Sequence, residues 1–212
     1  MADDLIDTLI AEQGRLYSEE MGAELARDTP EELFHWLIGA ILLSARISAH
    51  NAVEAGAALR GAGLHRADAI AAAERAELVR VLNENGYARY DESTADYLRD
   101  TAAWARESCG ADLRRLEEGQ GAAGVLKRLQ GAKGLGPLGA RIYGREAQLV
   151  RDVFYPTIDG KAAEQARAYG LPDDPAALAG AAGGRERFVR LAAALTRAAL
   201  DGPTEAVARA AG

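Results

Sequence analysis

The stretch from Leu129 to Ala147, LQGAKGLGPLGARIYGREA, decides which fold the chain is expected to adopt. Apolar residues at helical spacing stand on both sides of a glycine-rich turn, Gly134-Leu135-Gly136, and Pro137 follows directly. Proline is favoured at the first position of a helix, where its missing N–H would have no acceptor within the helix. The segment 125–149 is therefore predicted to be two helices joined by a tight turn.

The composition of this turn also predicts what it binds. Glycine permits a positive φ and carries no side chain that would block a phosphate. The first amide groups of the second helix are unpaired and would point toward the same gap. Lys133 and Arg141 would add positive charge, while Leu135 would point into the core. The turn thus predicts a backbone site for one DNA phosphate; a merely solvated face carrying Lys133 and Arg141 is the alternative.

The rest of the chain indicates an all-α protein. Alanine, a strong helix former, dominates the 49% of residues that are hydrophobic, and no run alternates as a strand would. We expect a polar helix over residues 3–27, a core helix over 32–46 that is apolar on almost every side, and a long helix over 91–108. A last core helix is expected over 185–200, with fraying after Pro203.

Composition also limits the class of protein. Leu37 to Ile47 is too short and too polar at its end to span a membrane, and the N-terminus lacks the basic region of a secretory signal. A single cysteine, Cys109, excludes a disulfide framework, a cysteine zinc site and an iron–sulfur cluster. We therefore expect a cytoplasmic, nucleoid-associated protein with no membrane partner, no metal and no cofactor.

Charge bears on a nucleic-acid partner in two opposite ways. The net charge of −7 is unfavourable for binding phosphates. The stretch from Lys127 to Arg151, however, carries six lysines and arginines against one acidic residue, Glu146. A basic patch of this kind can bind DNA on an acidic chain.

Four segments in this order resemble the endonuclease III-like, helix-hairpin-helix DNA glycosylase superfamily. Gly134-Leu135-Gly136 is similar to the family's hairpin, and Ile158-Asp159 is similar to the Val-Asp pair that opens a later helix. Leu42-Leu43-Ser44-Ala45-Arg46 looks like its Leu-Leu-Ser-Ala-Gln segment, and Gly86-Tyr87 falls where the family has a wedge loop. The resemblance covers residues 30 to 170.

The resemblance implies two helical lobes with a cleft between them. Residues 30–135 would form one lobe, and residues 1–29 together with 150–212 would form the other. The hairpin, 125–149, would lie at the mouth of the cleft. The partner implied is double-stranded DNA containing a lesion, bound by a monomer.

The resemblance also implies the residues of the site. Asp159 would be the catalytic carboxylate, although an aspartate before a helix is also a common N-cap. The hairpin residues expected to bind DNA are Lys133, Gly134, Leu135, Gly136, Leu138, Gly139 and Arg141. The residues expected at the base gap or pocket are Arg46, Ser48, His50, Tyr87, Tyr90 and Lys161. For each side chain of this second group, a solvated or packing role is the alternative.

One departure from the family limits the reaction. Strand-cleaving members carry a lysine nucleophile where this chain has Leu138. The expected activity is therefore that of a monofunctional glycosylase, which hydrolyses the bond between a damaged base and its sugar. A helix-hairpin-helix protein that binds DNA without catalysis, and a structural helical domain, are the alternatives.

Overall fold

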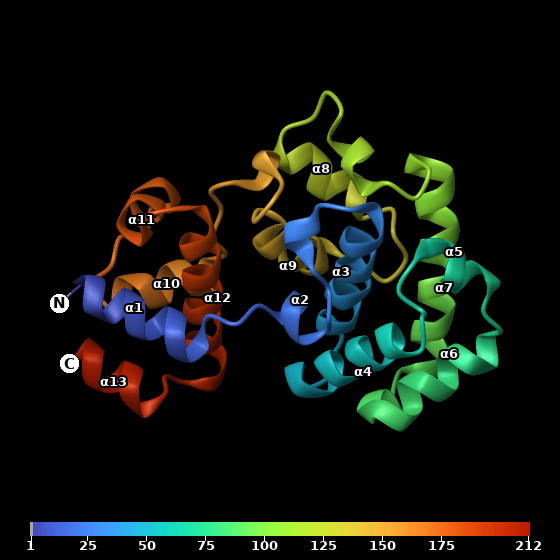
Figure 1. Ribbon diagram of the computed structural model, residues 1–212, viewed down its shortest axis with the longest axis horizontal. Helices are drawn as coiled ribbons and strands as arrows, with labels where there is room; N and C mark the ends of the chain where they lie inside the picture. Colours follow the sequence, from blue (N-terminus) through green and yellow to red (C-terminus); the bar gives the residue numbers. More distant parts are fainter. Residues whose placement is uncertain (1) are drawn as a thin grey trace. The chain divides into compact units, whose positions relative to one another are not determined.

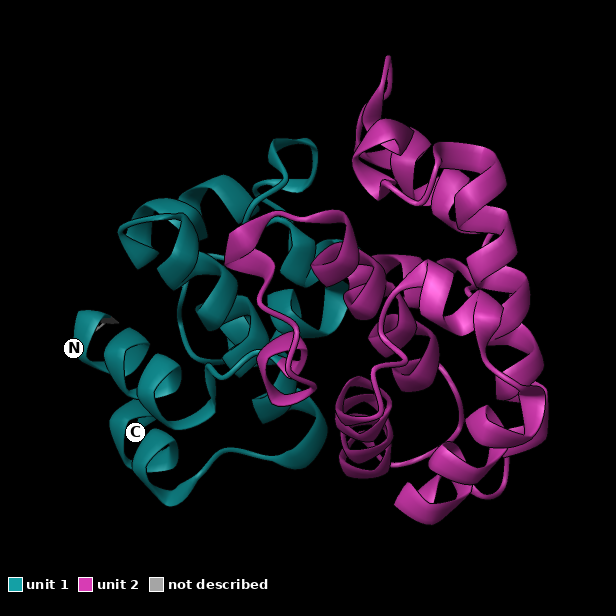
Figure 2. Cartoon of the chain, turned by 45° about the vertical axis from the view of Figure 1, so that its right-hand side comes forward, with its two compact units in different colours: residues 1–16, 144–212 teal, residues 17–143 magenta. Residues whose placement is uncertain are grey.

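The computed structural model describes residues 2–212, and these residues confirm the all-α class: they form helices and turns and contain no strand (Figure 1). Among the described residues, no helix has the length and apolar character needed to cross a bilayer. The chain divides into two compact units, which are described separately. Unit 1 comprises residues 1–16 and 144–212, and unit 2 comprises residues 17–143 (Figure 2). The boundary falls inside helix α9, after Tyr143.

Unit 2 contains the elements from α2 to the first part of α9. They are α2 (Tyr17–Glu20), η1 (Leu25–Arg27), α3 (Pro30–Leu43), α4 (Ala49–Gly61), α5 (Ala67–Ala72), α6 (Arg75–Leu82), η2 (Asn83–Tyr87), α7 (Asp91–Cys109), η3 (Leu113–Glu117), α8 (Ala122–Leu129) and α9 (Pro137–Ala147). Helix α3 packs against α4, and α7 packs against α5 and α6.

Helix α3 is the centre of unit 2, as its sequence predicts. Every residue from Glu32 to Leu42 is buried, so the helix is surrounded by protein on all sides. The indole Nε1 of Trp36 donates a hydrogen bond to the carbonyl of Tyr143 (2.9 Å), which fastens α3 to α9. This bond satisfies a polar atom that would otherwise be buried without a partner.

Polar residues on α3 hold the preceding segment in place. The Glu32 carboxylate, 3% exposed, pairs with Arg60 through two bonds of 2.8 and 2.9 Å and accepts a third bond from the Glu24 amide. His35, fully buried, has its Nε2 2.9 Å from the carbonyl of Met21. Burial lowers the pKa of His35 to about 4, so the ring is neutral at pH 7.

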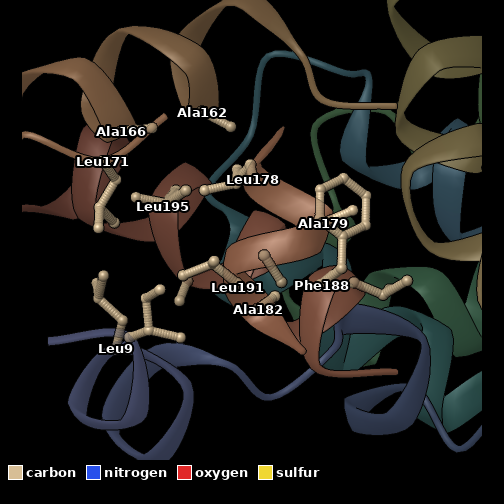
Figure 3. Close-up of a cluster of buried hydrophobic side chains, with 14 of the residues drawn as sticks. Leu9, Ala162, Ala166, Leu171, Leu178, Ala179, Ala182, Phe188, Leu191 and Leu195 are labelled. Carbon is tan, nitrogen blue, oxygen red and sulfur yellow. The ribbon is translucent and has the colours of Figure 1, made fainter. Parts of the chain in front are cut away.

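Unit 1 is built around α12 (Arg185–Asp201). Its other elements are α1 (Ala2–Gln13), the end of α9, η4 (Asp152–Phe154), α10 (Gly160–Ala168), α11 (Pro175–Ala182) and α13 (Glu205–Ala211). Helices α1, α10 and α11 pack against α12, and α13 packs against α1. Figure 3 shows Leu9, Leu191 and Leu195 in the shared interior with alanines of α10 and α11. The small alanines let these helices approach α12 closely.

Two expectations about the ends of the chain are wrong. The helix expected over 3–27 is broken into α1, α2 and η1. A side chain at Gly14 would lie 2.4 Å from the carbonyl oxygen of Ile10, and Gly22 has φ +85°, a left-handed conformation that no α-helix contains. At the other end, the residues after Pro203 form α13 because Thr204 caps it and Val207 is buried.

Candidate functional site

The turn between α8 and α9 has a defined backbone conformation. Gly134 adopts φ +81°, and the Leu135 amide donates to the Ala132 carbonyl (3.2 Å), which closes the turn. The Thr101 hydroxyl of α7 donates to the carbonyl of Lys133 (3.2 Å). The Leu135 side chain is buried, as predicted, so the turn is fixed to the core from two directions.

The glycines of this segment have different roles. A methyl group at Gly134 would lie 2.7 Å from Cδ2 of Tyr97, and one at Gly139 would lie 2.7 Å from Cδ1 of Leu135. A methyl group at Gly136 would meet no atom within 4 Å. Gly139 was expected among the DNA-binding residues, but it is buried and packs against Leu135 and Ser44. Gly136 is the position where an open surface meets the start of a helix.

The outer edge of the turn is exposed and carries two cations. Lys133, Gly134, Gly136 and Arg141 are all exposed, and Pro137 begins α9 as predicted. The first amides of α9 follow Gly136 and have no acceptor within their own helix. Leu138 is 55% exposed, which is unusual for a leucine and leaves an apolar side chain where the family has its amine.

A pocket of about 310 Å³ in unit 2 brings three distant segments together. Its lining includes Arg46 from the turn after α3, Tyr90 at the start of α7 and Gly134 from the α8–α9 turn. These are three residues that the sequence singled out independently. Tyr97 and Ser93 of α7 and Ser44 also line the pocket, and these were not predicted. The spacing of Tyr90, Thr94 and Tyr97, at i, i+4 and i+7, was the available signal for one helix face.

The two tyrosines predicted at this site have different positions. Tyr87 is 1% exposed, and its hydroxyl donates to the carbonyl of Leu42 (3.0 Å). Burial raises the pKa of Tyr87 to about 12, so the hydroxyl remains a donor. Its ring forms part of the pocket wall and is not available for stacking on a base, which corrects that prediction. Tyr90 is half-buried, with its ring centroid 6.4 Å from that of Tyr87 and the Arg89 guanidinium 5.4 Å from its centroid.

Ser48 and His50 are not brought into the pocket. Ser48 caps α4 by accepting a hydrogen bond from the Asn51 amide (3.2 Å), and His50 is exposed in the first turn of that helix. Neither residue lines the pocket that contains Arg46. Both follow the alternative interpretation, a helix cap and a solvated side chain.

Asp159 lies in unit 1 and uses both of its carboxylate oxygens. Oδ1 accepts a hydrogen bond from the Ala162 amide (2.9 Å), so the residue is the N-cap of α10. Oδ2 accepts a bond from Nη1 of Arg145 (3.2 Å), whose side chain is only 8% exposed. The Asp159 side chain is 25% exposed and can therefore be reached from solvent. Lys161 is exposed in the first turn of α10.

Gln148 was not predicted from the sequence, yet it anchors the chain segment that leads to Asp159. It is fully buried, its Nε2 donates to the carbonyls of Arg145 (2.8 Å) and Thr157 (2.9 Å), and its Oε1 accepts from the Thr157 amide (2.9 Å). Arg145 and Gln148 are one turn apart at the end of α9. Their only signal in the sequence is a pair of polar residues near a helix end.

Metal chemistry has no candidate site in the part of the chain that the structure describes. No three His, Cys, Asp or Glu side chains among residues 2–212 gather as a metal site would require. Cys109 is buried, and burial raises the pKa of its thiol. Both groups of candidate residues therefore consist of carboxylate, guanidinium, phenol, hydroxyl and backbone groups. No protein-family model, curated protein or solved structure matches the chain.

Proposed function

We propose that the protein is a monofunctional DNA glycosylase that removes a damaged base from double-stranded DNA. The observation that carries the proposal is the pocket in unit 2 where Arg46, Tyr90 and the turn at Gly134 converge. These residues come from segments that are far apart in the sequence, and each was singled out by its resemblance to a DNA-contacting segment of one superfamily. Three unrelated packing residues would have no reason to meet in this way.

The pocket and the turn offer the contacts that DNA requires. The exposed backbone at Gly136, together with Lys133 and Arg141, supplies a neutral cradle and two cations for a phosphate. Arg46 is exposed at the pocket, where its guanidinium can enter the space left by a flipped base. Tyr90 offers a ring on which a neighbouring base can stack.

The chemistry is assigned to Asp159. Cleavage of an N-glycosidic bond passes through a transition state with positive charge on the sugar, which a nearby carboxylate stabilises. The same carboxylate can accept a proton from the attacking water. With Leu138 in place of the family's lysine, the hairpin has no amine to form a covalent intermediate with the sugar. The product is therefore an abasic site in an uncut strand.

A panel of duplexes, each with one damaged base, tests the proposal. The protein is incubated with each duplex, and alkali then cleaves any abasic sites. Wild-type protein should give cleavage that depends on alkali for at least one lesion, and Asp159→Asn should abolish it. Asp174→Asn is the matched control, because Asp174 caps α11 through the same bond to a backbone amide (2.9 Å) and is exposed. Equal loss in both variants would contradict a chemical role for Asp159.

A second candidate function is DNA binding without catalysis. It is favoured by the two bonds that already occupy the Asp159 carboxylate, which is the arrangement of a structural cap and ion pair. This alternative predicts salt-sensitive duplex binding that survives Asp159→Asn and no base release from any lesion. Absence of duplex binding at low salt would leave only a structural helical domain.

A further inference from the structure

We infer that Arg145 and Gln148, at the end of α9, are positioning residues that hold the Asp159 carboxylate in its reactive orientation. The inference rests on the proposed function, because it assigns Asp159 the role of acting on the sugar. It adds two residues that neither the turn motif nor the pocket includes. Both act through Asp159 and its segment, and neither is assigned contact with DNA.

Arg145 fixes the carboxylate itself. One oxygen of Asp159 bonds to the Ala162 amide at 2.9 Å, and the other bonds to the Arg145 guanidinium at 3.2 Å. Two bonds to two different oxygens define the plane of the carboxylate. An ionised carboxylate has about four lone-pair positions, so two remain for a sugar or a water molecule. The 25% exposure of the Asp159 side chain leaves these positions accessible.

Burial of the guanidinium makes this arrangement rigid. The Arg145 side chain is 8% exposed, so its conformations are restricted by the surrounding protein. The other ion pairs between arginine and aspartate in unit 1 are more exposed; in the pair Arg167–Asp173 the side chains are 66% and 46% exposed. Exposed pairs of this kind contribute little and hold neither partner in one place. Arg145 is therefore suited to fixing a direction in a way that Arg167 is not.

Gln148 fixes the backbone on the other side of Asp159. Its carboxamide both accepts from the amide and donates to the carbonyl of Thr157, two residues before Asp159 (2.9 Å each). The same Nε2 donates to the carbonyl of Arg145 (2.8 Å), which links the two positioning residues. A fully buried amide with these partners cannot rotate without leaving polar groups unsatisfied. The last turn of α9 thus holds both the side chain and the approach segment of Asp159.

The consequence for the reaction is a dependence on geometry. A misplacement of about 1 Å can lower a rate by about 10²-fold. Removal of either positioning residue should therefore lower the rate of base release while leaving duplex affinity nearly unchanged. This pattern differs from that of a residue that contacts DNA, whose loss would weaken binding.

The test compares Arg145→Met, Arg145→Lys and Gln148→Leu with the matched control Arg167→Met, on the lesion that the wild type processes. Single-turnover base release should fall by about 10²-fold in Arg145→Met and Gln148→Leu, with duplex Kd within about threefold of wild type. Arg145→Lys keeps the charge and should recover at least tenfold over Arg145→Met. Arg167→Met should match the wild type. Base release within threefold of wild type in Arg145→Met or in Gln148→Leu would overturn the inference.

A second readout separates this inference from the proposed function. The Ala162 amide reports the N-cap bond to Asp159, and its hydrogen exchange is measured in the free protein without DNA. Exchange should be at least tenfold faster in Arg145→Met and Gln148→Leu than in wild type, and unchanged in Arg167→Met. If the wild type released no base, the proposed function would fail, yet faster exchange would still show that these residues position Asp159. Unchanged exchange in the folded variants, or in Arg145→Lys if Arg145→Met did not fold, would overturn the positioning role itself.

Discussion

The α8–α9 turn makes a sharp prediction, because two of its glycines differ in what a methyl group would meet. At Gly134 the methyl group of alanine would lie 2.7 Å from Cδ2 of Tyr97 and 3.4 Å from Cγ2 of Ile41, and the backbone has φ +81°. At Gly136 it would lie in open space, and φ is not in the left-handed range. Gly134→Ala should therefore destabilise the fold, whereas Gly136→Ala should not.

The magnitude follows from two contributions. An L-residue in the left-handed region costs about 1–2 kcal/mol, and overpacking a core adds about 1–3 kcal/mol. The lower entropy of alanine in the unfolded chain offsets this by at most about 1 kcal/mol. Gly134→Ala should lower the free energy of unfolding by about 2–4 kcal/mol. Gly136→Ala should change it by less than about 0.5 kcal/mol, as is usual for a surface substitution.

Urea denaturation followed by tryptophan fluorescence measures this difference. Trp36 and Trp104 both belong to unit 2, which also contains the turn, so the signal reports the correct part of the molecule. In the same preparation, Gly136→Ala should weaken duplex binding, because the methyl group would occupy the surface proposed for a phosphate. Equal stability of the two variants, or a larger loss in Gly136→Ala, would refute this account of the turn.

Three further predictions concern stability. Burial lowers the pKa of His35 to about 4, below its ordinary value of 6.5, so the unfolded chain binds the proton more readily. Stability should therefore fall by about 3 kcal/mol as the pH drops from 6.5 to 4, and urea midpoints across this range should lose that component of the slope in His35→Gln. Arg60→Met should cost about 3–5 kcal/mol because it leaves the buried Glu32 carboxylate without its cation; adding Glu32→Gln should restore part of the loss in the same titration. Thr204→Ala should cost about 1 kcal/mol by removing the cap of α13, visible as faster hydrogen exchange of the Val207 amide.

The sequence predicted those parts of the fold in which local pattern and burial agree. Helix α3 is apolar on every side, so it could only be a core helix, and Pro137 and Asp159 stand at helix starts because of their local chemistry. The N-terminal segment was misjudged because its apolar spacing continues past Gly14 and Gly22, whose backbone conformations interrupt the helix. Helix α13 was missed because its stability comes from the burial of Val207, a tertiary contact.

The candidate site was predicted to a smaller extent. Arg46, Tyr90 and Gly134 were found because each belongs to a recognisable segment. Tyr87 has the same local features as Tyr90, and only the packed structure shows that its ring is buried. Arg145 and Gln148 could not be assigned partners from spacing, because Asp159 and Thr157 reach them through an irregular connection. Contacts between a helix end and a loop depend on the path of that loop, which no periodicity describes.

The most direct measurement for the central claim is mass-spectrometric detection of the free base released from a lesion-containing duplex. Wild-type protein should release the damaged base and leave both strands uncut, Asp174→Asn should do the same, and Asp159→Asn should release none. Base release undiminished in Asp159→Asn would contradict the assignment of the chemistry to this carboxylate, and no release by the wild type from any lesion would contradict the glycosylase itself.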